Sequence, residues 1–351
     1  MKTAVRSLLV VGWMLVGVPI VQAGVYSTLE PPPFDFDAQG LPIALSSSGY
    51  ASKLATVQEV GIEPFTPNPQ SLRGRYLKRM TEFQQRGEES LTPEERADLG
   101  GALIRLRRTD KAFDWLRQAS RERNADFFTW THLAAVCAVK EQWPAAMEAQ
   151  QIGKGEFPEM LFDYPPAQRD WYRRVERDYL TKWLKLRAGE RRVTGFGGNV
   201  VEQVDAIFGT IDWGDATGNY LAGSLAESER AKLPPDALAI AQQLSIWAPD
   251  DTRLFWLVGE LYNVNGDLPA AIRIMDACVD SRRYNNDNLS KHRHMLKEAL
   301  ALQIAQKEAA DAIAWRPPTS RLLMVGVVAV PLLLLLFGWQ LREWFGRKHR
   351  G

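Results

Sequence analysis

Histidine and cysteine are the residue types most able to bind a metal or act as a nucleophile, and the chain holds only four His and two Cys. His292 and His294 stand two positions apart in a stretch that favours a helix, which places them on different sides of that helix. Zinc needs its ligands on one side together with a third donor, so we predict no metal site. Cys137 and Cys278 fall at positions where a predicted helix packs against its neighbour in an internal repeat described below. This placement favours two buried free thiols over a disulfide.

Glycine-rich loops can hold phosphates, and residues 191–220 contain six of the 26 glycines. No strand, turn and helix pattern surrounds Gly195 to Gly198, and the sequence has neither a Gly-x-Ser-x-Gly nor a His-Glu-x-x-His motif. We therefore predict no cofactor and no catalytic residue. One alternative stays open, an envelope enzyme or glycan-binding protein with its site in residues 191–220, because 12 Trp could also serve as a sugar-binding platform.

Length and charge exclude some classes of function. The 351 residues allow two compact domains, and 43 Lys and Arg against 42 Asp and Glu give a net charge of +1. A nucleic-acid-binding protein normally carries a basic excess, so we expect no nucleic acid partner.

The first residues are typical of a secretory signal. Lys2 and Arg6 precede a short apolar run, and the small residues Val21 and Ala23 come three and one before a predicted cut after Ala23. We assign residues 1–23 to a signal peptide. An uncleaved N-terminal anchor is the alternative.

The other end is typical of a membrane anchor. Residues 322–341 are uncharged and would form a helix about 30 Å long, the thickness of a hydrocarbon core. Trp339 and Trp344 mark its boundary, and the basic tail 342–351 follows. We predict a single-pass protein of the cell membrane with an exported N-terminal domain and a cytoplasmic C-terminal tail.

Between these ends the composition changes several times. Residues 24–70 are rich in proline and serine, and we interpret them as an extended, partly ordered arm. A solvated linker is the favoured role, and a partner-binding arm is the alternative. From Ser71 onward helical periodicity predicts a helix that ends at Gly87, and Thr92 to Glu95 form a capping box. We divide the rest into 71–160, which is helical with repeats, 161–220, a long helix and glycine-rich insertion, and 221–315, repeats and a capping helix.

An internal repeat occupies two of these regions. Ala134 follows Gly100 by 34 positions, and Ala146 follows Ala112 by the same interval. A similar pattern runs from Thr252 to Asn285. The chain resembles the tetratricopeptide repeat family, although Arg107 and Glu141 stand where glycine is usual in that family.

The resemblance implies an all-α solenoid of stacked helix pairs, with the glycine-rich insertion interrupting it, and one concave face that binds a peptide or helix. Carried onto residues 252–285, it implies these partner-groove residues: Arg253, Trp256, Glu260, Asn263 and Val264. The matching positions of the earlier repeat, among them Phe128, are largely apolar, so we expect the chain's own helix near 167–186 to cover them. The implied function is a non-catalytic, membrane-anchored scaffold that binds a protein or peptide on the exterior, periplasmic-type side.

Overall fold

The structure is a computed structural model. It describes residues 26–30, 32–66, 68–159, 161, 164–189, 203–215, 217–284 and 286–314. These residues form helices and turns, and within them the only β pairing is three isolated bridges, so the all-α expectation is confirmed. The chain divides into one compact unit that ends at Lys297 and a second that begins at Glu298.

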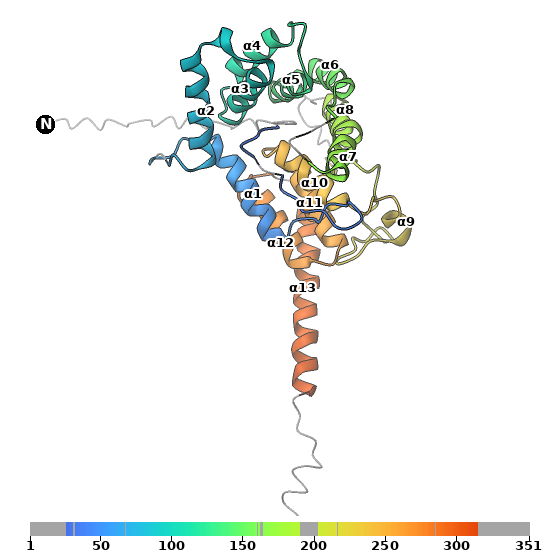
Figure 1. Ribbon diagram of the computed structural model, residues 1–351. Helices are drawn as coiled ribbons and strands as arrows, with labels where there is room; N and C mark the ends of the chain where they lie inside the picture. The colour runs from blue at the N-terminus through green and yellow to red at the C-terminus, as the bar shows by residue number, and fades with distance from the viewer. Residues whose placement is uncertain are drawn as a thin grey trace, which may run out of the picture. The chain divides into compact units, whose positions relative to one another are not determined.

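The helices follow one another along the chain with short connections (Figure 1). Their bounds are α1 Ser47–Val60, α2 Leu72–Arg86, η1 Glu88–Ser90, α3 Pro93–Arg105, α4 Thr109–Ala119, α5 Phe127–Val139, α6 Trp143–Gly155, α7 Pro166–Arg174, η2 Val175–Leu180, α8 Thr181–Gly189, α9 Glu227–Arg230, α10 Ala237–Trp247, α11 Thr252–Val264, α12 Leu268–Asp280 and α13 Asp287–Ala314. The predicted capping box of α3 is present, with Thr92 and Glu95 each bonding the other's backbone.

Three helix pairs share one register. The second helix begins 16 positions after the first in each, at 93 and 109 for α3 and α4, at 127 and 143 for α5 and α6, and at 252 and 268 for α11 and α12. The turn residues Arg107, Glu141 and Gly266 occupy the same place in each pair and have φ values of 58°, 56° and 78°. Arg107 and Glu141 therefore adopt the left-handed conformation that glycine adopts without steric cost.

Small residues let the paired helices approach closely. A Cβ atom added to Gly100 of α3 would lie 2.4 Å from the Leu116 side chain of α4, so glycine is required there. Ala112, Ala146 and Ala271 are fully buried at equivalent positions of the second helices. The packing role that the sequence predicts for these positions is confirmed.

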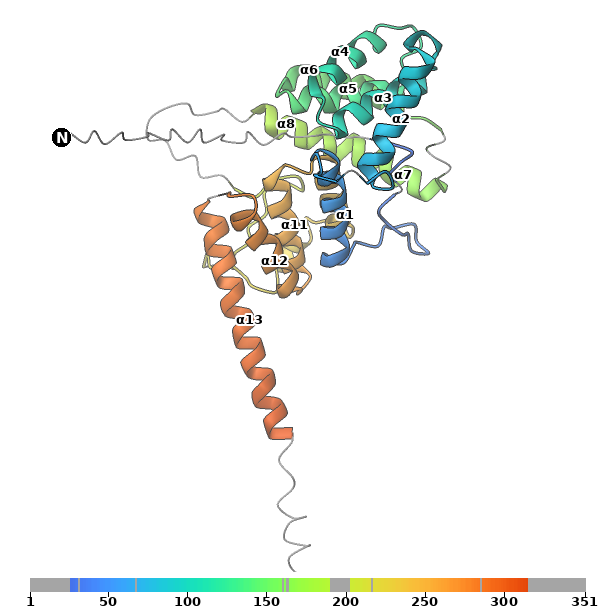
Figure 2. The ribbon, with the colours of Figure 1, turned by 90° about the vertical axis from the view of Figure 1, so that its left-hand side faces the viewer.

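A long helix lies between the groups α2–α6 and α10–α12 (Figures 1 and 2). It consists of α7, the π-helical η2 and α8 without interruption, and it begins at Pro166, one residue from the predicted start.

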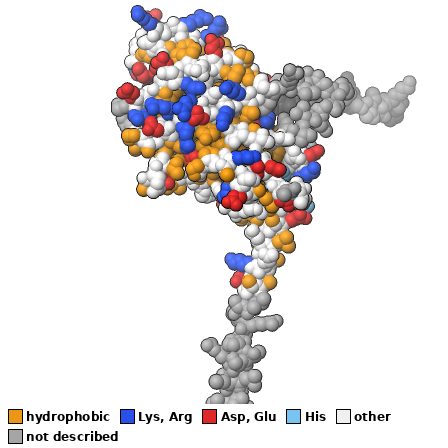
Figure 3. All heavy atoms as spheres, turned by 90° about the vertical axis from the view of Figure 1, so that its right-hand side faces the viewer, with side chains coloured by type: hydrophobic (Ala, Val, Ile, Leu, Met, Phe, Trp, Pro, Cys, Tyr) orange, Lys and Arg blue, Asp and Glu red, His pale blue; other side chains and the backbone are white. Residues whose placement is uncertain are grey.

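On the face drawn in Figure 3, basic side chains alternate with acidic and apolar ones. Asp170 lies near Arg169 and Arg173, and the Arg173 guanidinium lies 4.9 Å from the Phe157 ring centre.

The prediction of an extended, solvated arm at 24–70 is wrong for much of this region. Helix α1 forms within it because Tyr50, Leu54 and Val57 recur at steps of four and three, and all three are buried. The helix packs against α2 and α10. Residues 26–46 are not helical, yet Tyr26 and Phe34 are buried in the core.

The last described helix, α13, ends at Ala314, one residue before the end of the region 221–315 to which we assign repeats and a capping helix. Among the described residues no helix is both long enough and apolar enough to cross a membrane. The predicted signal peptide 1–23, transmembrane helix 322–341 and basic tail 342–351 lie outside the described residues, as do positions 190–202 of the glycine-rich insertion.

Candidate binding site on helix α11

Helix α11 carries all five predicted groove residues. It begins after Asp251, whose side chain accepts hydrogen bonds from the backbone N–H groups of Arg253 and Leu254. The side chains of Trp256, Glu260, Asn263 and Val264 are buried, and Arg253 is partly buried. The helix face that the resemblance places in an open groove is therefore covered in this structure.

The chain's own segment 203–223 provides much of this cover. The Asn263 side chain holds it at one end, where its Oδ1 accepts the Gly223 N–H at 2.5 Å and its Nδ2 donates to the Leu221 carbonyl at 2.9 Å. Helix α11 begins at residue 252, so one period of 34 earlier a first helix would begin near residue 218 and α10 would be its second helix. Segment 203–223 occupies the position of that first helix. Just beyond it, Arg230 donates to the Val264 carbonyl.

Glu260 lies at the centre of the covered face and is completely buried. Its carboxylate accepts hydrogen bonds from the Tyr220 hydroxyl at 2.6 Å and from the Trp256 indole N–H at 2.7 Å. The Nδ1 atom of His292, from α13, lies 2.6 Å from the same carboxylate. Burial and the neighbouring Glu260 charge both raise the pKa of Tyr220, so its hydroxyl stays a donor.

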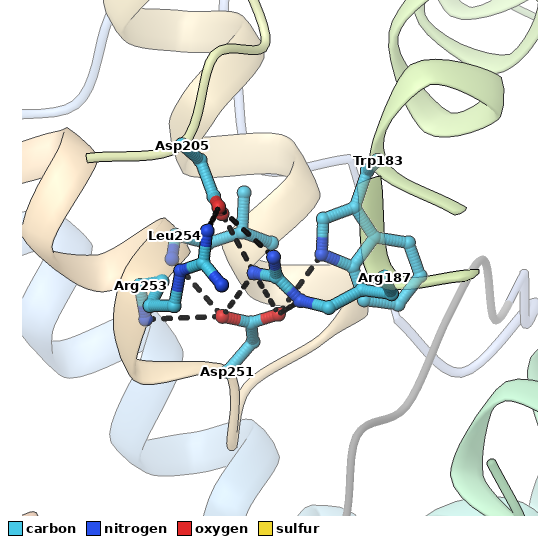
Figure 4. A network of polar contacts seen from close by, with 6 residues as sticks. All are labelled: Trp183, Arg187, Asp205, Asp251, Arg253 and Leu254. Carbon is cyan, nitrogen blue, oxygen red and sulfur yellow. Dashed lines mark hydrogen bonds and ion pairs between the residues drawn. The ribbon is translucent and has the colours of Figure 1, made fainter. Parts of the chain in front are cut away.

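A network of buried charges fixes the other end of segment 203–223 (Figure 4). Arg187 of α8 donates to both oxygens of Asp205, at 2.9 and 2.6 Å, and to both oxygens of Asp251. Arg253 contacts Asp205 at 2.9 Å, and the Trp183 indole N–H donates to Asp251 at 2.9 Å. Two guanidinium groups therefore balance two carboxylates, which joins α8, α11 and the segment.

The electrostatics of Asp251 follow from these contacts. Burial opposes its charge, but the Arg187 guanidinium and the hydrogen bond from the Leu254 N–H outweigh burial and hold the pKa of the carboxyl below its ordinary value. The carboxylate thus stays charged and serves both as helix cap and as ion-pair partner.

A cavity of about 420 Å³ lies beside this face. Segment 203–220 forms most of its wall, and helices α11 and α13 complete it with Trp256, Asn288 and His292. Its volume falls in the range of about 300 to 1,000 Å³ that is usual for small-molecule sites.

A second extended segment, residues 26–46, is held in a similar way. The Gln242 amide of α10 accepts the Leu45 N–H at 2.9 Å and donates to the Leu45 carbonyl at 2.9 Å. At the other end, the Tyr26 N–H lies 3.1 Å from Nε2 of His132, whose Nδ1 lies 2.8 Å from the Ala97 carbonyl. Burial lowers the pKa of His132, and a neutral ring with its proton on Nδ1 accepts the Tyr26 N–H.

Buried side chains of the array also receive this segment. The Arg105 guanidinium donates to both Glu30 oxygens at 2.7 and 2.9 Å, and the Tyr76 hydroxyl donates to the same carboxylate at 2.7 Å. The Tyr26 ring contacts Phe128 of α5, with ring centres 6.2 Å apart. The sequence led us to expect helix 167–186 at that position, and the N-terminal segment lies there instead.

The sequence located α11 but missed the residues that cover it. Arg187 and Asp205 belong to regions without a recognisable motif, and Asp251 stands at the start of α11, where an aspartate is an ordinary N-cap. His292 drew attention as a metal ligand and not as a partner of Glu260. Only the N-cap pattern of Asp251 gave a local signal, because the other contacts join residues far apart in the chain.

Metal and thiol chemistry receive no geometric support in the described part of the chain. No group of three or more His, Cys, Asp or Glu residues there could hold a metal ion. Cys137 and Cys278 are free and buried, as predicted, and burial raises the pKa of their thiols to about 11 and about 12. Both are therefore unreactive at neutral pH.

Comparison of the chain with family models, with curated proteins and with solved structures found no match in any of the three.

Proposed function

We propose that the protein is a non-catalytic, membrane-anchored scaffold of the tetratricopeptide repeat type that mediates protein–protein interaction. The shared register of three helix pairs supports the repeat assignment, as do their left-handed turn residues. In this proposal residues 322–341 cross the cell membrane once. The helical unit faces the exterior, periplasmic-type side, and the tail 342–351 is cytoplasmic.

The bonds of Asn263 are the observation that carries the proposal. Its amide contacts only main-chain groups, the Gly223 N–H and the Leu221 carbonyl. A partner's extended peptide can offer the same two groups whatever its sequence. We propose that such a peptide replaces residues 218–223, which we call the exchange stretch.

The exchange stretch has the backbone and the anchors that a local replacement needs. Gly218 and Gly223 at its ends have φ values of 82° and 78°, a conformation that glycine adopts freely. The chain before it is fixed by Asp205 in the buried charge network, and the chain after it by Arg230. The main chain of the stretch also pairs with the preceding flank, through the Leu221 N–H to the Trp213 carbonyl at 3.0 Å and the Asp215 N–H to the Asn219 carbonyl at 2.7 Å. We propose that these two bonds break when the stretch leaves α11, while its flanks stay in place.

The energy of the replaced contacts sets the affinity that a partner needs. Two neutral hydrogen bonds to Asn263 and one from Tyr220 to the Glu260 carboxylate together contribute about 3 to 6 kcal/mol. Competition from the stretch then lowers the apparent affinity of the partner by roughly 10² to 10⁴.

Tyr220→Phe tests the exchange because it weakens the occupant and leaves every α11 side chain unchanged. The variant loses one hydrogen bond to a carboxylate, so the recovery of a groove-bound partner should rise roughly tenfold or more at limiting partner concentration. The measurement is quantitative recovery of envelope proteins with tagged full-length protein after cross-linking in cells.

Tyr50→Phe is the matched control. The Tyr50 hydroxyl donates to Ser245 at 2.6 Å, and Tyr50 is also buried, but it lies in α1 and not in the exchange stretch. A partner whose recovery rises in Tyr220→Phe alone supports the exchange. If every recovered protein responds equally to both variants, or falls in Tyr220→Phe, the exchange does not occur.

The topology is tested separately with single cysteines in a Cys137→Ser, Cys278→Ser background. A membrane-impermeant maleimide should label a cysteine at exposed Phe65 in cells whose outer barrier is opened, and should label one at Gly351 only after lysis. The reverse pattern would refute the proposed orientation.

A further inference from the structure

The cavity beside α11 has a lining that selects for one kind of ligand. Trp213, Tyr220 and Trp256 contribute aromatic rings, and the described lining contains no Lys or Arg. Besides these rings, the lining offers the hydrogen-bonding side chains of Gln203, Thr210, Asn288 and His292. Such a lining does not favour a phosphate or another anion, which needs cationic partners.

The two carboxylates of the lining differ. Asp205 is buried and neutralised by Arg187 and Arg253, so a cationic ligand would have to compete with two guanidinium groups for it. Asp212 is exposed, and one of its oxygens accepts the Gly214 N–H at 2.9 Å. The rest of the lining is uncharged or aromatic, which suits a neutral ligand with several hydroxyl or amide groups.

His292 supplies a fixed hydrogen-bonding atom for such a ligand. The ring stacks on Tyr220, with ring centres 4.0 Å apart and planes 21° apart, so its orientation is set. Its Nδ1 lies 2.6 Å from the buried Glu260 carboxylate, which leaves Nε2 to hydrogen-bond a ligand hydroxyl, a group that both donates and accepts. Within the described residues Nε2 has no hydrogen-bond partner, and His292 lines the cavity.

Asn288 extends this polar edge. It precedes His292 by four positions on α13, which places both side chains on one face of the helix. Both line the cavity, together with glycine-containing main chain and Trp213. An imidazole nitrogen, an amide and aromatic rings therefore line one space.

We propose that this cavity binds a neutral sugar ring. A pyranose offers hydroxyl groups to His292 and Asn288 and an apolar face of C–H groups to an aromatic ring, which matches the two kinds of lining. This site goes beyond the partner exchange and excludes it, because Gly218 and Tyr220 line the cavity and would leave it in the exchange. Sugar binding is measured without a partner, so its failure and the failure of the exchange are distinguishable.

The test uses full-length protein in a polyoxyethylene detergent, because sugar-headed detergents would compete. Glucose, N-acetylglucosamine and cellobiose are the probes, and glucose 6-phosphate is the charged counterpart. Saturation-transfer NMR reports which sugar protons touch the protein, and a titration gives the affinity. We expect at least one neutral probe to bind and glucose 6-phosphate to bind more weakly than glucose.

Two variants locate the binding. His292→Asn keeps a donor near the Nδ1 position for Glu260 but removes the Nε2 atom, and Asn288→Ala removes the amide without touching the Glu260 cluster. Each should weaken binding roughly tenfold, the effect of one hydrogen bond. Trp130→Phe, a change to a partly buried tryptophan of α5 that lies outside the cavity lining, should leave the affinity unchanged.

Three results would overturn the proposal. These are the absence of saturation transfer to all three neutral probes, tighter binding of glucose 6-phosphate than of glucose, and a sugar affinity that neither Asn288→Ala nor His292→Asn changes. Circular dichroism of each variant must match the wild type, and if His292→Asn unfolds, Asn288→Ala alone decides.

Discussion

Removing Arg187 should unfold the protein far more readily than removing an exposed arginine. In Arg187→Met the Asp251 carboxylate loses its ion-pair partner while it stays 5% exposed, and only the neutral donors Trp183, Arg253 N–H and Leu254 N–H remain. Asp205 keeps Arg253 at 2.9 Å. Leaving a buried charge uncompensated costs about 3 to 5 kcal/mol.

The assay is urea unfolding of full-length protein in detergent, followed by tryptophan fluorescence and circular dichroism. The expected loss in unfolding free energy corresponds to a fall in melting temperature of roughly 6 to 20 °C. Arg177→Met is the matched control, because Arg177 pairs with Asp178 on the surface, where an ion pair contributes about 0 to 1 kcal/mol.

A double variant distinguishes an uncompensated charge from lost packing. Adding Asp251→Asn to Arg187→Met removes the unpaired carboxylate while an amide oxygen can still cap α11. The double variant should therefore be about 1 to 3 kcal/mol more stable than the sum of the two single losses predicts. Strict additivity, or an Arg187→Met loss no larger than that of Arg177→Met, would refute the reasoning.

Three further measurements probe other parts of the fold. Burial raises the pKa of Glu176 to about 7 from its ordinary 4.5, so the native state holds the extra proton, and unfolding free energy should fall as pH rises from about 4.5 to about 7. Glu176→Gln should abolish that decline, about 3 kcal/mol between the two limits, in urea titrations at a series of pH values. Gly100→Val forces a Cβ against Leu116 and should lower the free energy of unfolding by about 1 to 3 kcal/mol. At Gly155 an added Cβ meets nothing within 4 Å, so Gly155→Ala should change the free energy of unfolding by less than about 1 kcal/mol. Thr92→Ala removes the α3 cap and should cost about 1 kcal/mol in the same assay.

Local sequence patterns predicted the helices that are stabilised by contacts between residues close together in the chain. Thr92 and Glu95 form their capping box because both partners lie within one helical turn. The 34-residue period placed the second helices correctly, because small residues such as Gly100 and Ala112 recur wherever paired helices touch. Helix α1 was missed because prolines on both sides outweigh its short apolar pattern of Tyr50, Leu54 and Val57.

The cover of α11 could not be predicted in the same way. Arg253 and Asp205 are 48 positions apart, and Glu260 and His292 are 32 apart, so no local spacing links them. The family resemblance described an exposed groove, and it carries no information about an insertion that folds back onto that groove. The sequence pattern of segment 203–223 consists of glycines and scattered acidic residues. This pattern indicates turns but does not indicate which helix the segment packs against.

The charges that each extended segment buries decide which of the two can exchange with a partner. Segment 26–46 places Glu30 against the buried Arg105, and withdrawing it would leave that guanidinium without its carboxylate. The same holds for Asp205 in the charge network. The exchange stretch buries no charge of its own, because its bonds run from the Tyr220 hydroxyl and from main-chain groups. When the exchange stretch leaves, the Glu260 carboxylate becomes exposed to water. When Glu30 leaves, the Arg105 guanidinium stays buried without an ion-pair partner. We therefore propose partner exchange for residues 218–223 and not for segment 26–46.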